Sequence, residues 1–330
     1  MSLRAAVIGC GKIGSTFADD PRVRGVYTHA GAYVACPDTQ LVAVCDSDGA
    51  SAERSARKWS VPSHYTDAAA LLREQRPDMV SLCTPSASHG ALLRSVLDSP
   101  SVRGVLMEKP LSLDVREARQ LVELANSRGV VLAVNYCRRY SAGHRRIRDL
   151  IQAEALGPIQ RIAGYYTKGL FHNGTHWIDL ARWLFGEIES VHGHCLRGWD
   201  GSDGQADAVL RFRTGAVGFL MGLDAEAFSL FEMDIVGTRQ RVRVTDSGYR
   251  LECFEVGESP YFTGYRTLLK SWDADGDMED TLLHAVADLV WSLRENRTPE
   301  CSGADGLAAL EVAAAVVESA RASGPRAGSP

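Results

Sequence analysis

Short apolar runs alternate with amphipathic stretches through the first 135 residues of the chain. The apolar runs are rich in Val, Leu and Ala and lack polar alternation, which is typical of parallel strands covered on both faces. They predict strands at Leu3–Ile8, Leu41–Cys45, Met79–Cys83, Val105–Met107 and Val130–Val134. The intervening pattern predicts helices at Ala50–Lys58, Ala68–Glu74, His89–Leu97 and Val115–Ser127. Residues 1–135 are therefore expected to form an open, doubly wound parallel α/β sheet.

The pattern changes after about residue 150, where strand candidates follow one another without helices between them. Helices are expected at Ala142–Ala153 and His176–Phe185, and two more close the chain at Met278–Arg294 and Ala304–Ala322. The expected strands are Ile159–Tyr166, Ser190–Leu196, Ala208–Arg213, Val217–Leu223, Phe231–Val236, Val242–Thr245 and Tyr249–Phe254. Short connections between strands imply a large, mostly antiparallel open sheet. Residues 136–322 are therefore expected to form an α+β domain, and 323–330 a flexible tail.

Bulk composition narrows the class of protein. A length of 330 residues suits two domains, and 45% hydrophobic with 23% charged residues is ordinary for a globular chain. A net charge of −5 gives no reason to expect nucleic acid or an anionic membrane as a partner. No signal peptide or membrane span is apparent. Eight scattered cysteines without a Cys-x-x-Cys pair favour reduced thiols in the cytoplasm and disfavour a zinc site.

A glycine motif follows the first predicted strand. Its residues are Gly9, Cys10, Gly11, Lys12, Ile13 and Gly14, and a helix is expected to begin directly after them. In this G-x-G-x-x-G pattern the first glycine permits a tight turn, the second admits a pyrophosphate and the third allows close helix–strand packing. The helix N-terminus then offers N–H groups to the phosphates. The motif predicts a Rossmann domain that binds a dinucleotide.

The second strand ends at Asp46, whose carboxylate can accept hydrogen bonds from both adenosine ribose hydroxyls and would repel a 2′-phosphate. Ser47 follows in place of an arginine, so NAD is favoured over NADP as the cofactor. Asp46 lies 32 residues after Gly14 (46 − 14), against an expected spacing of about 20. The surplus includes the Pro- and Gly-containing stretch 19–25. We therefore expect a loop to interrupt the first helix, which Tyr27–Cys36 resumes.

Two further turns lie after the predicted strands Met79–Cys83 and Val105–Met107, at the sheet edge where ligands of open α/β sheets bind. The first turn carries Thr84, Pro85, Ser86 and His89, and the second carries Glu108 and Lys109 before Pro110. The first would serve equally well as a plain capped turn. A lysine held between a buried strand and a proline at this edge is a better candidate for function than an average surface lysine.

The set of motifs GCGKIG, CD, TPSASH, EKP, NYCRRY and GTHWIDLARWLFG, in this order and spacing, resembles the Gfo/Idh/MocA family of oxidoreductases. The resemblance covers most of the chain. It implies a Rossmann domain with a nicotinamide at the junction to a second domain, and homodimers or homotetramers formed through the sheet of that domain. It also implies that the turns above, including Glu108 and Lys109, line the cofactor.

By the same resemblance, Lys109 matches the family's EKP lysine and His176 its acid/base histidine. Asp179 lies one helical turn further on. His172, Asn173 and Asp179 are expected to contact the substrate. Arg138 is expected to hold charge on the substrate, although a surface-facing pair of Arg138 and Arg139 agrees equally well with the sequence. Many members that act on cyclitols have an aspartate where this chain has His172, which casts doubt on inositol as the substrate. His172 and His176 also have the spacing of a metal pair, but no third ligand is apparent and no metal is expected.

The leading hypothesis is hydride transfer between NAD(P) and a hydroxyl or keto carbon of a sugar, cyclitol or nucleotide-linked sugar. His176 would accept the hydroxyl proton, and Lys109 would stabilise negative charge on the reacting oxygen. Two alternatives remain: a glycosidase that uses tightly held NAD for transient oxidation, and a regulator that binds dinucleotide without chemistry. The fold supports all three classes. Lys109 and His176 favour an enzyme, because a binding module needs neither.

Overall fold

A computed structural model of the chain describes residues 2–199 and 203–323. It divides into two compact units. The first comprises Met1–Tyr140 and Glu279–Ala308, and the second comprises Ser141–Met278 and Ala309–Pro330. The flexible tail predicted for 323–330 lies, from residue 324 onward, outside the described residues. None of the described helices is long and apolar enough to cross a membrane.

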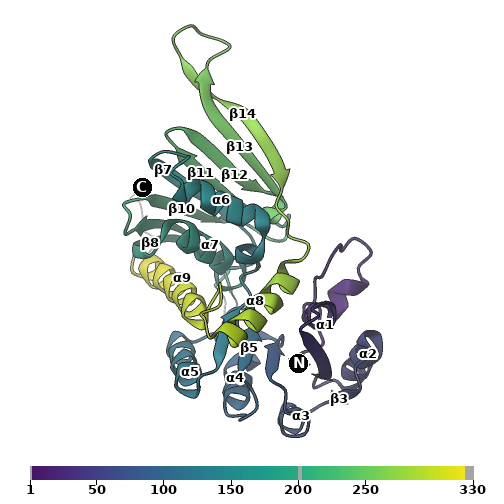
Figure 1. Ribbon diagram of the computed structural model, residues 1–330. Helices are drawn as coiled ribbons and strands as arrows, with labels where there is room; N and C mark the ends of the chain where they lie inside the picture. The colour runs from purple at the N-terminus through teal and green to yellow at the C-terminus, as the bar shows by residue number, and fades with distance from the viewer. Residues whose placement is uncertain (1, 200–202, 324–330) are drawn as a thin grey trace. The chain divides into compact units, whose positions relative to one another are not determined.

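A six-stranded parallel sheet forms the centre of the first unit (Figure 1). Its strands are β1 (Leu3–Ile8), β2 (Thr39–Cys45), β3 (Ser63–Tyr65), β4 (Met79–Leu82), β5 (Gly104–Met107) and β6 (Val131–Val134). Their order is β3-β2-β1-β4-β5-β6. This order is that of a dinucleotide-binding Rossmann domain, with the switch point between β1 and β4. The doubly wound parallel sheet predicted for this part of the chain is confirmed; only β3, whose three residues lack an apolar run, was not predicted.

Helices cover both faces of this sheet. They are α1 (His29–Ala35), α2 (Gly49–Trp59), α3 (Ala68–Gln75), α4 (His89–Leu97), α5 (Val115–Arg128) and α8 (Thr281–Glu295). Helices α3, α4 and α5 pack side by side on one face, and α2, α1 and α8 on the other. The crossovers β1–β2 and β2–β3 supply only α1 and α2 to that second face. Helix α8 packs against β5, β6 and α1 and covers the remainder.

This use of α8 corrects the expected division of the chain, which placed all of 136–322 in the second domain. Residues 279–308 group instead with the first unit. The physical reason is that a parallel sheet needs cover on both faces, and the half formed by β4–β6 has no crossover helix on this side. Helix α9 (Gly303–Ser323) begins in the first unit and continues into the second.

The second unit is built on an eight-stranded sheet with the order β14-β13-β12-β11-β7-β10-β9-β8. Its strands are β7 (Ile159–Tyr166), β8 (Ile188–Arg197), β9 (Gln205–Phe212), β10 (Val217–Gly222), β11 (Phe231–Gly237), β12 (Gln240–Thr245), β13 (Arg250–Glu258) and β14 (Arg266–Asp275). Only β7 and β10 pair in parallel, so the mostly antiparallel sheet is confirmed. Helices α6 (Ala142–Gln152) and α7 (Thr175–Phe185) belong to this unit. Buried and half-buried residues alternate along β9, β10 and β11, as expected when one face packs on a core.

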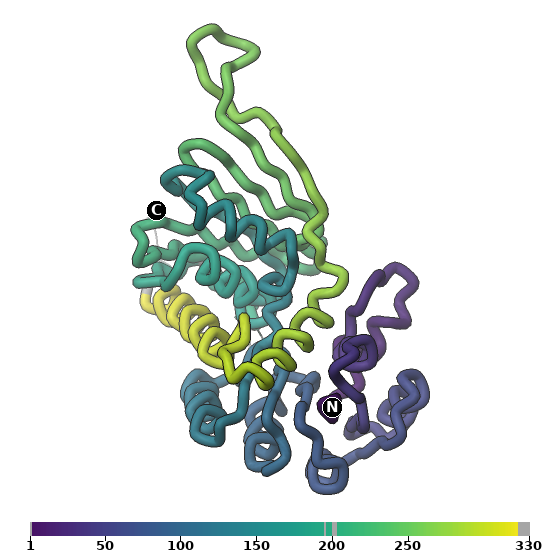
Figure 2. The backbone as a smooth tube through the Cα atoms, viewed as in Figure 1, coloured from purple at the N-terminus to yellow at the C-terminus, as the bar shows by residue number. Residues whose placement is uncertain are grey.

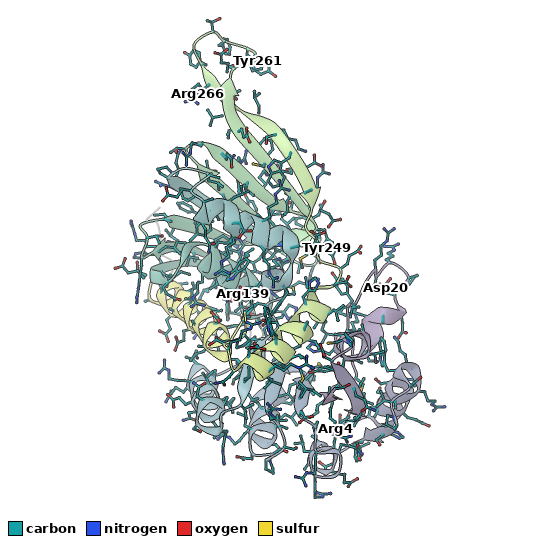
Figure 3. All side chains as sticks on the ribbon, viewed as in Figure 1. Arg4, Asp20, Arg139, Tyr249, Tyr261 and Arg266 are labelled. Carbon is teal, nitrogen blue, oxygen red and sulfur yellow. The ribbon has the colours of Figure 1, made fainter. Side chains whose placement is uncertain are left out.

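Strand β14 was not predicted. It pairs with β13 in a long hairpin that extends beyond the neighbouring strands, with Tyr261 near its free end (Figure 3). Tyr261, Phe262 and Tyr265 at this end are 83%, 68% and 69% exposed. The residues of β14 itself are all exposed or half-buried. The core therefore imposes no regular alternation of apolar and polar side chains on it.

The glycine motif does not open onto a regular helix. Residues 11–15 form a helical turn that continues into a short 3₁₀ helix at Thr16–Asp19, and regular α-helix starts only at His29. The predicted loop within the first helix is confirmed, and Figure 2 shows it as an excursion of the chain near α1. Asp20, labelled in Figure 3, lies on this loop.

Hydrogen bonds show how the helix accommodates the loop. The His29 N–H donates to the Ile13 carbonyl at 3.0 Å, and the Ala30 N–H donates to the Gly14 carbonyl at 3.0 Å. An uninterrupted α-helix would make these bonds from residues 17 and 18, four positions after their acceptors. Residues 17–28 are therefore an insertion of twelve residues (29 − 17) that leaves the helical register intact. This number equals the surplus in the spacing between Gly14 and Asp46.

A buried polar network connects α1 to the ends of the central strands. His29 is fully buried, and its Nδ1 lies 2.9 Å from Ser81 Oγ on β4 while its Nε2 lies 3.0 Å from Glu108 Oε1. Asn135 donates from Nδ2 to the same Glu108 oxygen at 2.6 Å. Ser81 in turn donates to the Tyr33 hydroxyl at 3.0 Å. The network fixes Glu108 directly after β5.

Opposing effects act on the Glu108 carboxyl. Burial raises its pKa, but the hydrogen bond and charge of His29, the charge of Lys109 and the Asn135 hydrogen bond together lower it below its ordinary value of 4.5. A carboxyl with a lowered folded-state pKa stabilises the fold above its unfolded pKa. This contribution is lost as the pH falls through the folded-state value.

Removing residues 17–28 and joining Thr16 to His29 should leave a folded protein. We expect the free energy of unfolding to fall by no more than about 2 kcal/mol, because the deletion removes the exposed Lys58–Asp19 ion pair and the bond from the Val26 N–H to Asp280. The N-cap bond from the Gly31 N–H to the buried Thr28 is also lost, but a continuous helix no longer needs that cap. Urea unfolding monitored by circular dichroism measures this free energy. Deleting only 17–27 is the matched control, since it rotates His29 by about 100° around the helix. Equal destabilisation by the two deletions would contradict the inferred register.

Glu108→Gln should destabilise the protein by about 2–4 kcal/mol at pH 7, because it removes the charged partner of a buried histidine. The difference from the parent protein should shrink as the pH falls below 4.5, where Glu108 itself takes up a proton. Urea unfolding between pH 3.5 and pH 7 tests this. Glu74→Gln, at a surface ion pair with Arg73, is the control and should show little effect. A penalty that does not vary with pH would rule out the ionised Glu108.

Candidate functional site

The glycine turn after β1 meets the end of β4. Gly9 has φ +101°, and a Cβ on it would lie 2.6 Å from the Cys83 carbonyl carbon and 2.8 Å from the Thr84 nitrogen. A Cβ on Gly14 would overlap the Gly9 carbonyl oxygen. At Gly11, by contrast, a Cβ would meet no atom within 4 Å. Packing thus requires the first and third glycines, whereas the second faces open space of the kind a pyrophosphate needs.

Asp46 is tied to the glycine turn. Its Oδ2 accepts from the Cys10 N–H at 2.8 Å and its Oδ1 from the Asp48 N–H at 3.0 Å. These two bonds fix the carboxylate plane at the end of β2, where a ribose would be bound. Ser47 is exposed beside it, and Lys12 and Ile13 lie on the turn itself. Burial raises the Cys10 pKa to about 11, so this thiol stays protonated at neutral pH.

The turn after β4 carries Thr84, Pro85 and Ser86. Ser88 Oγ donates to Thr84 Oγ1 and contacts the Pro85 carbonyl, both at 2.8 Å. Since a Cβ at Gly9 would overlap the backbone of this turn, the two turns lie against each other at one edge of the sheet. The structure therefore brings together the two segments that the sequence assigned to the cofactor.

His89 joins this turn to the turn after β5. The ring is 1% exposed, with Nε2 2.8 Å from the Thr84 carbonyl oxygen and Nδ1 2.6 Å from that of Pro110. Both nitrogens are thus engaged with the backbone, and its predicted contact with the cofactor stays a prediction. What the structure shows is that His89 holds the two turns together.

Lys109 lies between two anchored neighbours. Glu108 before it is held by His29 and Asn135, and Pro110 after it is held by His89 through its carbonyl. The peptide bond between Lys109 and Pro110 is cis. Glu108 Oε1 lies within hydrogen-bond distance of His29 and Asn135. The sequence predicted a cofactor contact for Glu108 but not these two partners. The backbone on both sides of Lys109 is therefore fixed.

Arg138 follows β6 on the short helix Cys137–Tyr140 and is 7% exposed. Burial lowers the pKa of its guanidinium, partly offset by Cys137. The adjacent Arg139 has a structural role, because it donates to the Glu300 carbonyl at 2.9 Å and to Asp305 at 3.1 Å. Its charge, together with Ser302, outweighs burial and lowers the Asp305 pKa.

In the second unit, the predicted substrate residues lie on one helical run. Leu170–Gly174 form a π turn that leads directly into α7. His172 is exposed and Asn173 half-buried on the turn, while His176 is half-buried in the first turn of α7. Asp179, one turn later, is 1% exposed. π turns within helices are frequent at functional sites. Across the described ranges no cluster of three or more metal-ligating side chains occurs.

Sequence reasoning missed residues that support the candidates from a distance. His29 and Asn135 hold Glu108, and Asp203 accepts hydrogen bonds from the N–H groups of Phe171 and His172. The twelve-residue insertion hid His29, since it displaced this residue from the glycine motif. Asp203 lies 31 residues after His172, and no local pattern connects the two.

Family models match both parts of the chain. Residues 3–136 match the oxidoreductase family domain described as an NAD-binding Rossmann fold, and residues 167–326 match that family's C-terminal α/β domain. Together they span most of the sequence. The glycine turn and Asp46 described above lie within the first match.

Similar proteins are named as dehydrogenases. D-glucoside 3-dehydrogenase of Escherichia coli is 29% identical over 59% of this chain and 58% of its own length. Myo-inositol 2-dehydrogenase of Thermotoga maritima is 24% identical over 93% of each chain. Among solved structures, UDP-N-acetylglucosamine 3-dehydrogenase from Acidithiobacillus ferrooxidans has the same fold, with a TM-score of 0.79, 24% identity and 98% of each chain covered.

These matches agree with the geometry of the first unit, where the glycine turn leaves open space at Gly11 and Asp46 closes the end of β2. The residues present therefore fit the cofactor that the family model names. The chain belongs to the Gfo/Idh/MocA family of NAD-binding oxidoreductases.

Proposed function

We propose that the chain is a dehydrogenase that transfers a hydride between NAD(H) and the hydroxyl or keto carbon of a sugar, cyclitol or nucleotide-linked sugar. The three similar proteins named above act, by their names, on a glucoside, an inositol and a nucleotide sugar. Asp46 supports NAD over NADP, since its fixed carboxylate would repel a 2′-phosphate.

The observation that carries this proposal is the anchoring of Lys109. Its neighbours on both sides are held by buried side chains, so the amine projects from a rigid backbone at the cofactor edge of the sheet. Rigid placement of a cation is what stabilisation of a developing negative charge requires. A lysine that served only for solubility would not need this support.

We assign complementary roles to two side chains. Bound NAD supplies the acceptor for the hydride. Lys109 stabilises the negative charge that develops on the substrate oxygen as its proton leaves. His176 accepts that proton on an imidazole nitrogen and returns it when a ketone is reduced.

The remaining predicted residues divide between cofactor and substrate. We propose that the cofactor is held by the glycine turn, by the end of β2 and by the two turns that His89 joins. These residues are Gly9, Gly11, Lys12, Ile13, Gly14, Asp46, Ser47, Thr84, Pro85, Ser86, His89, Glu108 and Lys109. We propose that His172, Asn173, Asp179 and Arg138 recognise the substrate. Both histidines of the helical run lie within one turn of each other, which places their backbones on one short segment.

We also propose that copies of the chain associate through the sheet of the second unit, as a homodimer or homotetramer. The half-buried face of this sheet supports this, because it carries Val209, Phe219 and Met221 beside charged residues. A cytoplasmic location stays a prediction. The cysteines whose side chains are described are free thiols, which supports a reducing compartment.

Lys109→Ala and His176→Ala should each lower turnover by about 10²- to 10⁴-fold, because each removes a group that acts on the reacting oxygen or its proton. Absorbance of NADH at 340 nm, with methyl β-D-glucoside, myo-inositol and UDP-N-acetylglucosamine as substrates, measures the effect. Lys270→Ala and His64→Ala, at exposed positions, are the matched controls.

Near-normal turnover in both variants would refute the catalytic assignment. The parent protein also separates the other function classes. A dehydrogenase forms NADH in proportion to product, a glycosidase with tightly held NAD releases sugar without net NADH, and a regulator does neither.

Asp46→Ala should weaken NADH binding by about tenfold and leave NADPH binding much less affected, because the variant loses an acceptor for ribose hydroxyls together with a charge that repels a 2′-phosphate. Fluorescence titration with both reduced dinucleotides measures the two affinities. Asp98→Ala, at a surface ion pair with Arg128, is the control. An unchanged ratio of the two affinities would exclude Asp46 as the discriminating residue.

A further inference from the structure

Three consecutive N–H groups begin the helical run that carries the proposed substrate residues. The Leu170 N–H donates to the Gly204 carbonyl at 2.8 Å. The Phe171 N–H donates to Asp203 Oδ1 at 2.9 Å, and the His172 N–H donates to Asp203 Oδ2 at 2.6 Å. All three acceptors come from the two residues that precede β9. The start of the run is therefore held by a segment distant in sequence.

Asp203 does here what an N-cap residue does within a helix. The first N–H groups of a helix have no partners inside it, and a carboxylate satisfies them while complementing the positive end of the helix dipole. The next two N–H groups, of Asn173 and Gly174, both donate to the Gly169 carbonyl. Each amide from Leu170 to Gly174 thus has a partner, and Asp203 is the partner of two of them, those of Phe171 and His172.

Gly169, the residue before this run, leaves room for the Asp203 carboxylate because it has no side chain. Gly169 has φ +88°, a conformation that L side chains rarely adopt, and a Cβ on it would overlap the Asp203 carboxylate. The close approach of Asp203 thus depends on a glycine at this point. Two independent features, the paired hydrogen bonds and the missing side chain, fit the same contact.

We propose that Asp203 is a positioning residue that fixes the π turn and thereby places His172 and Asn173 for recognition of the substrate. It acts through the backbone and does not itself touch the substrate. This inference rests on the proposed function for its consequence in catalysis. The effect on the turn itself does not depend on that function.

The first experiment tests the turn without any substrate. In Asp203→Ala, hydrogen–deuterium exchange of the segment 168–174 should be at least about tenfold faster than in the parent protein, because two amides lose their acceptor. Gly169→Ala should give the same local result, since its Cβ displaces the carboxylate. Asp224→Ala is the matched control, because the exposed Asp224 accepts from a single N–H, that of Glu226, in another loop.

The second experiment measures the consequence for activity with the same three substrates. For whichever compound the parent protein oxidises, Asp203→Ala should raise KM by about tenfold, whereas the Kd for NADH should stay within about twofold. Asp203→Asn, which keeps one acceptor oxygen, should fall between the parent protein and Asp203→Ala. This graded order and the separation of KM from cofactor affinity would not arise from a general loss of stability.

Unchanged exchange of the segment 168–174 in Asp203→Ala would overturn the inference, whatever the enzyme acts on. An equal loss of NADH affinity would also overturn it, because the effect would then not be confined to the turn. If the parent protein oxidised none of the compounds while exchange rose as expected, the proposed substrate class would fail and the role of Asp203 in the turn would stand.

Discussion

The hydrogen bonds from His29 to Ile13 and from Ala30 to Gly14 are the interactions on which the cofactor half of the protein depends. They keep the first helix in register across twelve inserted residues. That register places His29 beside Glu108, and Glu108 lies next to Lys109. The glycine turn and the amine proposed for catalysis are thus linked by one short series of buried contacts. A shift of one residue in the helix would turn the imidazole away from its carboxylate partner.

Much of the Rossmann unit could be predicted from sequence because its physical causes are local. Strands covered on both faces are continuous apolar runs, and β1, β2, β4, β5 and β6 all show this signal. The surplus of residues between Gly14 and Asp46 is also a local property of the sequence, and it revealed the insertion. β3 and β14 lack such runs and were missed. Helix α8 was predicted as a helix, but its packing on the first unit depends on an uncovered sheet face that no local pattern reports.

The candidate residues likewise divide into those that short sequence patterns predicted and those that only tertiary contacts reveal. The glycine motif, Asp46, Lys109 and His176 come from short patterns with known chemistry, and the structure places the first three along one edge of a sheet. Their supports could not be predicted. His29 and Asn135 act on Glu108 from other elements, and His89 turned out to engage two backbone carbonyls. The π turn that carries His172 depends on Asp203, and α7 and β8 lie between the turn and Asp203 in sequence. Tertiary contacts of this kind leave no periodic trace.

The insertion at 17–28 has a practical consequence for protein engineering. Both of its ends are fixed by the helix on either side, so the chain leaves and re-enters at a single defined point. Its middle, near Asp20, is exposed. Such a point suits the genetic insertion of a fluorescent reporter, because added residues would leave the helix and the glycine turn in register.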